Sequence, residues 1–101
     1  MSVLVAVKIK GDTDLFEKAL ADRAAEFAEI AERGRSAGAI HHRFGIGDGY
    51  VLVVDEWETA EQFQDFFTTP ELQLFIGSVG GDTSAPPEMT VSRAVSSSDE
   101  F

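Results

Sequence analysis

The sequence predicts an α+β domain whose elements follow one another in the order β-α-β-β-α-β. Two observations lead to this prediction. A continuous apolar strand over residues 50–57 passes directly into a capped amphipathic helix, and apolar residues recur at three- and four-residue spacing between residues 15 and 31. Because the strand is apolar on both faces and the helices of a 101-residue chain can cover only one, the other face needs a partner.

The first part of the chain is predicted to form a strand followed by a long helix. Val3 to Ile9 is an apolar run with β-branched residues at every second position, which indicates a strand. Asp12 or Thr13 can then cap a helix of about five turns. The apolar face of this helix continues up to Gly34, and the glycines at 34 and 38 suit a helix stop and a turn.

The middle of the chain is predicted to form a β-hairpin. Ala39 to Phe44 begins the second strand of the domain. The glycine-rich segment 45–49 supplies residues that accept the positive φ angles of a tight turn. Tyr50 to Trp57 then forms the returning strand.

Two helix starts and a last strand follow the hairpin. Thr59 followed three residues later by Gln62 is a capping box, so a helix is predicted to begin at Ala60. Thr69-Pro70 predicts a second start, with threonine as the N-cap and proline at the first helical position. Met89 to Val95 is predicted to be the fourth strand.

This order of elements is that of the ferredoxin-like fold. Its antiparallel sheet carries both helical segments on one face and leaves apolar side chains on the other. The sequence therefore predicts a homodimer in which two sheets pack face to face. Residues 1–95 are predicted to form a single domain and residues 96–101 a flexible acidic tail.

Composition excludes several classes of function. Eighteen acidic residues against eight basic ones give a net charge of -10, so phosphate backbones and anionic bilayers would repel the chain. We therefore expect no nucleic-acid or membrane partner. The absence of cysteine excludes disulfides, thiolate nucleophiles and thiolate-ligated metals. No apolar run approaches the ~20 residues of a spanning helix and no signal peptide is evident, which predicts a cytoplasmic protein.

Three segments carry a resemblance to a known family: Val53-Val54-Asp55-Glu56-Trp57-Glu58, Ala60-Glu61-Gln62-Phe63 and Thr69-Pro70-Glu71-Leu72. Together with the element pattern from Val3 to Val95, they resemble the dimeric α/β-barrel superfamily, and within it the antibiotic-biosynthesis monooxygenase-type domains. The resemblance implies a small-molecule-binding protein and, if it is an enzyme, a cofactor-independent monooxygenase acting on an aromatic or polyketide-like substrate. Because the superfamily also contains cyclases, isomerases and members without known activity, the fold alone does not set the reaction.

The sequence departs from the haem-degrading members of this superfamily. Those proteins use an asparagine in the first strand and a histidine in the second helical region. This chain contains no asparagine, and its second helical region offers Phe63, Phe66 and Phe67 but no histidine. We therefore expect no haem and no other cofactor.

Trp57 is the first candidate for contact with a ligand. By strand alternation Asp55 and Trp57 share one face of the sheet. The resemblance implies that this tryptophan faces the cleft between sheet and helices, where a planar aromatic substrate sits. The alternative is that the indole only packs under the second helical region against Phe63 and Phe67.

His41 and His42 are the candidate bases. Adjacent strand residues point to opposite faces, so the pair cannot chelate one metal ion, and only one of them enters the cleft. A histidine near Asp55 or Glu56 on the neighbouring strand could act as a general base that the carboxylate orients. The alternative is a solvated or structurally satisfied histidine.

Arg43 and Tyr50 complete the candidate set as polar contacts to a substrate. Arg43 could hold an anionic substrate oxygen, and the alternative is an ion pair with one of the many acidic residues. The competing functional class is a non-catalytic binding or assembly module. In that case the cleft would be filled by the chain's own phenylalanines, of which there are eight.

Overall fold

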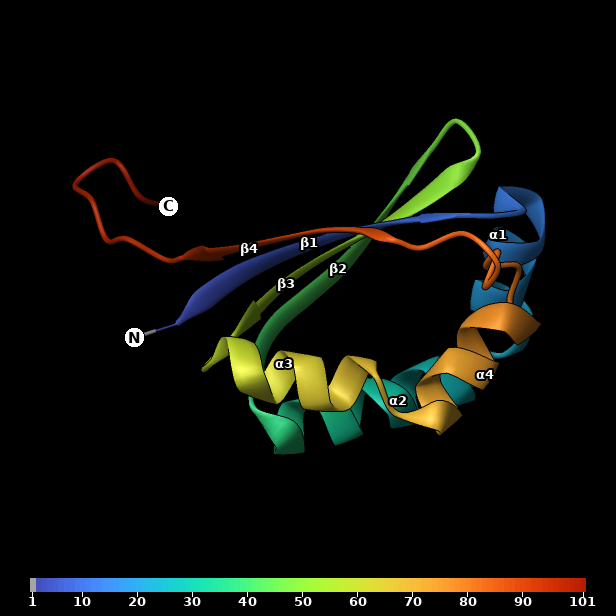
Figure 1. Ribbon diagram of the computed structural model, residues 1–101, viewed down its shortest axis with the longest axis horizontal. Coiled ribbons are helices and arrows are strands. Elements are labelled where there is room, and N and C mark those ends of the chain that lie inside the picture. Colours follow the sequence, from blue (N-terminus) through green and yellow to red (C-terminus); the bar gives the residue numbers. More distant parts are fainter. Residues whose placement is uncertain (1) are drawn as a thin grey trace.

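The computed structural model describes residues 2–101. Within them the chain forms a four-stranded antiparallel sheet, with α2, α3 and α4 along one face of the sheet and α1 at its end (Figure 1). The elements in chain order are β1 (Val3–Lys10), α1 (Thr13–Asp22), α2 (Ala24–Ala37), β2 (Ala39–Gly47), β3 (Tyr50–Trp57), α3 (Ala60–Phe67), α4 (Pro70–Ser78) and β4 (Glu88–Arg93).

The sheet has the strand order β2-β3-β1-β4, and every neighbouring pair is antiparallel. Val5 of β1 pairs with Asp55 of β3 on one side and with Val91 of β4 on the other, so these residues point to the same face. We call the face that the helices cover the inner face and the opposite one the outer face. The ferredoxin-like arrangement predicted from the sequence is confirmed.

The prediction of one long helix after β1 is wrong in one respect, because the structure divides this segment into α1 and α2 at Arg23. Asp12 caps α1 as predicted, accepting a hydrogen bond from the backbone N–H of Leu15. The predicted stop at Gly34 is also wrong. Gly34 is buried inside α2, and the helix ends before Gly38, whose φ of 126° suits only glycine.

The hairpin differs from its prediction in the position of the turn. β2 continues through the first glycines of the segment to Gly47, which pairs with Tyr50. The turn itself consists of Asp48 and Gly49, and Gly49 has a φ of 78°. β4 is shorter than predicted because its pairing with β1 ends at Arg93, and residues 94–101 form no helix or strand.

Both predicted caps in the second half of the chain are confirmed. The Thr59 side chain accepts a hydrogen bond from the backbone N–H of Gln62 and begins α3. The Thr69 side chain accepts one from the N–H of Leu72 and begins α4, with Pro70 at its first position. These caps place the two short helices end to end under the sheet (Figure 1).

The core consists of two separate clusters under the inner face. The first is built on Val5, Val7, Trp57 and Phe63, and the second on Phe16, Ala19, Val51 and Val79. Both clusters take residues from β3, so this strand connects them. The space between the clusters is where a site can form.

The outer face keeps large apolar side chains exposed to water. Leu4 is 50% and Val54 47% exposed, and Leu52 and Ala6 lie half-buried beside them. Exposed apolar residues that gather on one face indicate an interaction surface. No helix among residues 2–101 is long and apolar enough to cross a membrane.

Candidate functional site

A cavity of about 130 Å³ opens between the sheet and the helices. Its walls come from both core clusters, so it occupies the space that the two clusters leave between them. Most of the lining is apolar, and seven of the eight phenylalanines of the chain take part: Phe16, Phe27, Phe44, Phe63, Phe66, Phe67 and Phe75. The cavity is therefore a predominantly apolar pocket, rich in aromatic rings, of the kind that takes small apolar ligands.

A chain of three hydrogen-bonded side chains stands in the wall of this cavity, and we call it the polar chain: His42, Asp55 and Trp57. His42 Nδ1 lies 2.7 Å from Asp55 Oδ1, and Trp57 Nε1 donates to Asp55 Oδ2 at 3.0 Å. Asp55 is 8% and Trp57 2% exposed, whereas the His42 side chain is 38% exposed. The polar chain thus runs from the core to the open part of the pocket.

The buried carboxylate fixes the hydrogen on the histidine. An ionised carboxylate only accepts hydrogen bonds, so the pairing with Asp55 places the hydrogen of a neutral His42 ring on Nδ1. Nε2 is then an acceptor, and it has no hydrogen-bond partner among residues 2–101. The same carboxylate satisfies the indole N–H of Trp57, which would otherwise be buried without a partner.

A β-bulge decides which of the two histidines enters the pocket. Ala39 pairs with Trp57, but the next paired residue of β2 is His41, opposite Glu56, so Ile40 is an extra residue in the strand. A regular strand would place His41 opposite Asp55. The bulge shifts the alternation by one residue and places His42 there instead.

His41 consequently lies on the outer face. Its side chain is 77% exposed, and its Nε2 is 4.0 Å from Glu56 Oε1. Glu56 also accepts a 2.5 Å hydrogen bond from the Ser2 hydroxyl. The two candidate histidines are therefore separated by the sheet.

Arg43 and Tyr50 are placed apart from the other candidates. Arg43 pairs with Val54, and both residues belong to the outer face. Tyr50 packs over Gly47, and the Lys8 ammonium lies 4.3 Å from the centre of its ring. Neither Arg43 nor Tyr50 lines the cavity. The structure thus does not bring these two residues together with the polar chain.

Phe63 and Phe67 do line the cavity, on the side of Trp57. The Phe63 ring meets the indole at a centroid distance of 5.7 Å and stacks on Phe67 at 5.4 Å. Trp57 therefore does both things that the sequence left as alternatives: its indole packs in the core, and part of it faces the pocket.

The opposite wall contains a group of rings that the sequence did not single out as site residues. We call Phe16, Phe27, Phe44 and Phe75 the phenylalanine cluster. Its rings meet edge to face at centroid distances of 5.0–5.9 Å, and His42 meets Phe44 in the same way at 4.6 Å. Helical spacing indicated inward positions for Phe16, Phe27 and Phe75, but no local pattern indicates that four elements bring these rings together.

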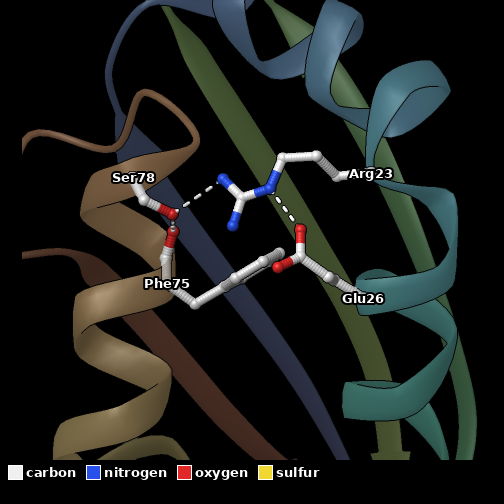
Figure 2. A network of polar contacts seen from close by, with 4 residues as sticks. All are labelled: Arg23, Glu26, Phe75 and Ser78. Atoms are coloured by element: carbon white, nitrogen blue, oxygen red, sulfur yellow. Dashed lines mark hydrogen bonds and ion pairs between the residues drawn. The ribbon is translucent and has the colours of Figure 1, made fainter.

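Arg23, at the break between α1 and α2, holds this wall from outside. Figure 2 shows its guanidinium between Glu26 of α2 and Ser78 of α4. Nη1 donates to Ser78 Oγ at 3.0 Å, and the guanidinium carbon lies 4.9 Å from the centre of the Phe75 ring. The hydrogen bond between Arg23 and Glu26 raises the pKa of the guanidinium and lowers the pKa of the carboxyl.

The chemistry that the pocket can support follows from the residues that line it. Its one histidine has a free acceptor nitrogen, and the surrounding walls are mostly apolar. Among residues 2–101, no three histidine, cysteine or acidic side chains form a group that could hold a metal ion. The geometry suits a proton transfer from a planar, weakly acidic ligand to His42.

Comparison by sequence finds no matching protein-family model and no matching curated protein. Comparison by structure finds many solved structures with the same arrangement of elements. SnoaB, a cofactor-independent oxygenase from Streptomyces nogalater, superposes with a TM-score of 0.64 at 14% identity over 98% of both chains. A protein named antibiotic biosynthesis monooxygenase superposes with a TM-score of 0.62 at 11% identity, over 93% of this chain and 99% of the other.

The chain has the fold of the antibiotic biosynthesis monooxygenases. A dimeric ferredoxin-like protein from an uncultured marine organism shares this fold too, with a TM-score of 0.61 at 17% identity over 99% of this chain and 93% of its own. The resemblance inferred from the sequence is confirmed at the level of the fold. Sequence identities this low support a shared fold but do not show a shared reaction.

Proposed function

We propose that the protein binds a planar aromatic molecule with an ionisable hydroxyl group and that His42 removes the proton of that group. The observation that carries the proposal is the polar chain, which places one oriented histidine in the wall of an otherwise aromatic cavity. His42 Nδ1 and Asp55 Oδ1 are 2.7 Å apart, which is within the range expected for a base and the carboxylate that orients it.

The polar chain would work as a proton acceptor in the following way. Asp55 holds the His42 ring through Nδ1 and leaves Nε2 to accept the ligand's hydroxyl proton. The imidazolium that forms stays paired with the Asp55 carboxylate, so its charge is balanced inside the pocket. The aromatic walls give the resulting ligand anion little solvation, which makes it a better electron donor.

The reaction that this arrangement supports best is a cofactor-independent oxygenation, the activity named for SnoaB. For a hydroquinone, the anion would transfer electrons to dioxygen. One oxygen atom would become a ring hydroxyl and the other would leave as water, so that hydroquinone and O₂ give hydroxyquinone and H₂O. The substrate supplies all four electrons, and no reduced cofactor is needed.

The alternative is a non-catalytic binding or assembly module whose cleft is filled by its own side chains. The concentration of seven phenylalanines in the walls favours this alternative. The remaining volume of about 130 Å³ and the unpaired His42 Nε2 at its edge favour a ligand site. We therefore place the ligand site first.

We also propose that the protein is a homodimer joined through the outer face. Leu4 and Val54 leave an apolar surface there, and a structural neighbour is a dimeric ferredoxin-like protein. An obligate dimer of this kind buries on the order of 2,000 Å² or more. Sedimentation at micromolar concentration should give twice the chain mass of 10.9 kDa, and a well-folded monomer would exclude the barrel. The cytoplasmic location stays a prediction from the sequence.

A fluorescence titration tests the binding part of the proposal. Trp57 is the only tryptophan, and its indole lines the cavity, so a bound aromatic should change its emission. The probes are phenol, hydroquinone and 2-naphthol, with calorimetry as the second readout. Saturable binding of at least one probe is the expected result. If none of the three binds by either method, the proposed ligand site does not exist.

A further inference from the structure

The two ends of the cavity are not anchored equally. Trp57 and Phe63, at one end, are both only 2% exposed and belong to the first core cluster. Phe75, at the other end, meets only Phe27 among the rings of the phenylalanine cluster, at 5.0 Å. It belongs to α4, in which none of the described residues Pro70–Ser78 is buried. Packing therefore holds the Phe75 wall less firmly than the Trp57 and Phe63 end of the pocket.

Polar contacts of Arg23 add to the packing of Phe75 against the second core cluster. Its guanidinium covers the Phe75 ring, donates to Ser78 Oγ and is itself fixed by Glu26 (Figure 2). The Ser78 hydroxyl in turn donates to the backbone carbonyl of Phe75 at 2.8 Å. These contacts tie α4 to the junction of α1 and α2 at the residue that carries the wall.

The volume of the pocket fits one aromatic ring. An apolar protein cavity of about 150 Å³ accommodates a single benzene molecule, and this cavity has about 130 Å³. A second fused ring exceeds this volume, so it would have to displace a wall or project through the opening beside His42. Phe75 yields more readily than Trp57 or Phe63, because those two residues are buried in the core.

We propose that the pocket selects single-ring phenols and hydroquinones and that Arg23 sets this limit by holding Phe75 in the wall. The inference rests on the proposed ligand site and adds a specificity-determining residue to it. Arg23 does not itself line the cavity, so it acts through Phe75 as a positioning residue.

The test compares phenol with 2-naphthol on the full-length protein, by Trp57 fluorescence and calorimetry. Arg23→Met keeps a long apolar side chain over Phe75 but removes both polar contacts. Arg35→Met is the matched control, because Arg35 forms a similar ion pair with Glu32 on α2 and does not touch the cavity wall. Phe75→Ala removes the wall directly.

Wild-type protein and Arg35→Met should bind phenol about tenfold or more tightly than 2-naphthol, because the second ring overfills the pocket. Arg23→Met should reduce or reverse this preference while leaving the phenol affinity within about twofold. Phe75→Ala should also reduce or reverse the preference, but it should weaken phenol binding as well because it removes a lining side chain. Equal affinities in the wild-type protein would overturn the inference and leave the ligand site standing. A preference that changes in Phe75→Ala but not in Arg23→Met would exclude the role of Arg23. If neither probe binds the wild-type protein, it is the proposed function that fails.

Discussion

The two faces of the sheet differ most clearly at His41 and His42, which are adjacent in β2. His42 lies on the inner face, hydrogen-bonded to a buried carboxylate and in edge contact with Phe44. His41 lies on the outer face, 77% exposed and 4.0 Å from Glu56. Identical side chains therefore receive different chemistry from their surroundings: one is oriented beside a dry pocket, and the other is a solvated group on an apolar surface.

A single backbone irregularity assigns the different positions of the two histidines. The extra residue Ile40 separates the pairing of Ala39 from that of His41. Without it, His41 would face Asp55, and His42 would lie on the outer face. The bulge thus sets which histidine meets the carboxylate, and the predictions below test the two faces against each other.

The largest expected effect on stability is that of Trp57→Ala. The indole is 2% exposed and packs against Phe63 and Phe66, so its removal should lower the free energy of unfolding by about 3–5 kcal/mol. Tyr50 is the aromatic residue at the other end of β3, on the outer face. Tyr50→Ala should lower the free energy of unfolding clearly less than Trp57→Ala does. Urea denaturation followed by circular dichroism at one fixed protein concentration measures both. Equal losses would contradict the assignment of the core to the inner face.

The second prediction concerns the adjacent acids of β3. Asp55→Ala leaves the indole N–H and the His42 ring without their partner in the core, which should cost about 1–3 kcal/mol of unfolding free energy. Glu56→Ala removes contacts to Ser2 and His41 near solvent and should cost about 0–1 kcal/mol. The same denaturation experiment applies, and a larger loss for Glu56→Ala would reverse the proposed roles of the two faces.

The third prediction concerns the proposed dimer. Val54→Asp places a charge in the centre of the apolar outer face and should shift the protein towards monomer in sedimentation equilibrium. Leu74→Asp is the control, because Leu74 is 77% exposed but lies on α4, away from that face. If both variants dissociate equally, or neither does, the outer face is not the interface.

The smallest expected effect is a pH dependence at the junction of the helices. The hydrogen bond that Glu26 accepts from Arg23 lowers the pKa of the Glu26 carboxyl below its ordinary value of 4.5. The pair therefore contributes stability above that value, and the contribution is lost as the pH falls through the lowered pKa. Glu26→Gln should be slightly less stable than wild type at neutral pH, and the difference should shrink as the pH falls below 4.5. Glu29→Gln, on the same helix and without an ion pair among residues 2–101, controls for the loss of one negative charge. A pH-independent difference between Glu26→Gln and wild type would contradict the assignment.

Local rules predicted most of the fold. The caps at Thr59 and Thr69 depend on residues within one helical turn, and alternation placed Asp55 and Trp57 on one face. The break at Arg23 could not be predicted in this way, because no local pattern marks it and the Arg23 side chain bonds Ser78, 55 residues away. A local sequence pattern can predict such a junction only when the residues that contact each other there are close in the sequence.

The site was predictable in composition but not in geometry. Trp57, Asp55 and one histidine could be named from the strands, since the pairing of β2 with β3 was expected. Which histidine turns inward depends on the bulge at Ile40, for which the sequence carries no glycine or proline signal. The placement of Arg43 outside the pocket follows from the same shift of register.

The central claim is that His42, and not His41, is the base of a ligand site. The most direct test is the rate of oxygen consumption with hydroquinone as substrate, measured for wild type, His42→Ala and His41→Ala after correction for autoxidation. His42→Ala should lose about 100-fold or more of the rate, and His41→Ala should stay near wild type. Equal rates in all three proteins, or a loss confined to His41→Ala, would contradict the claim.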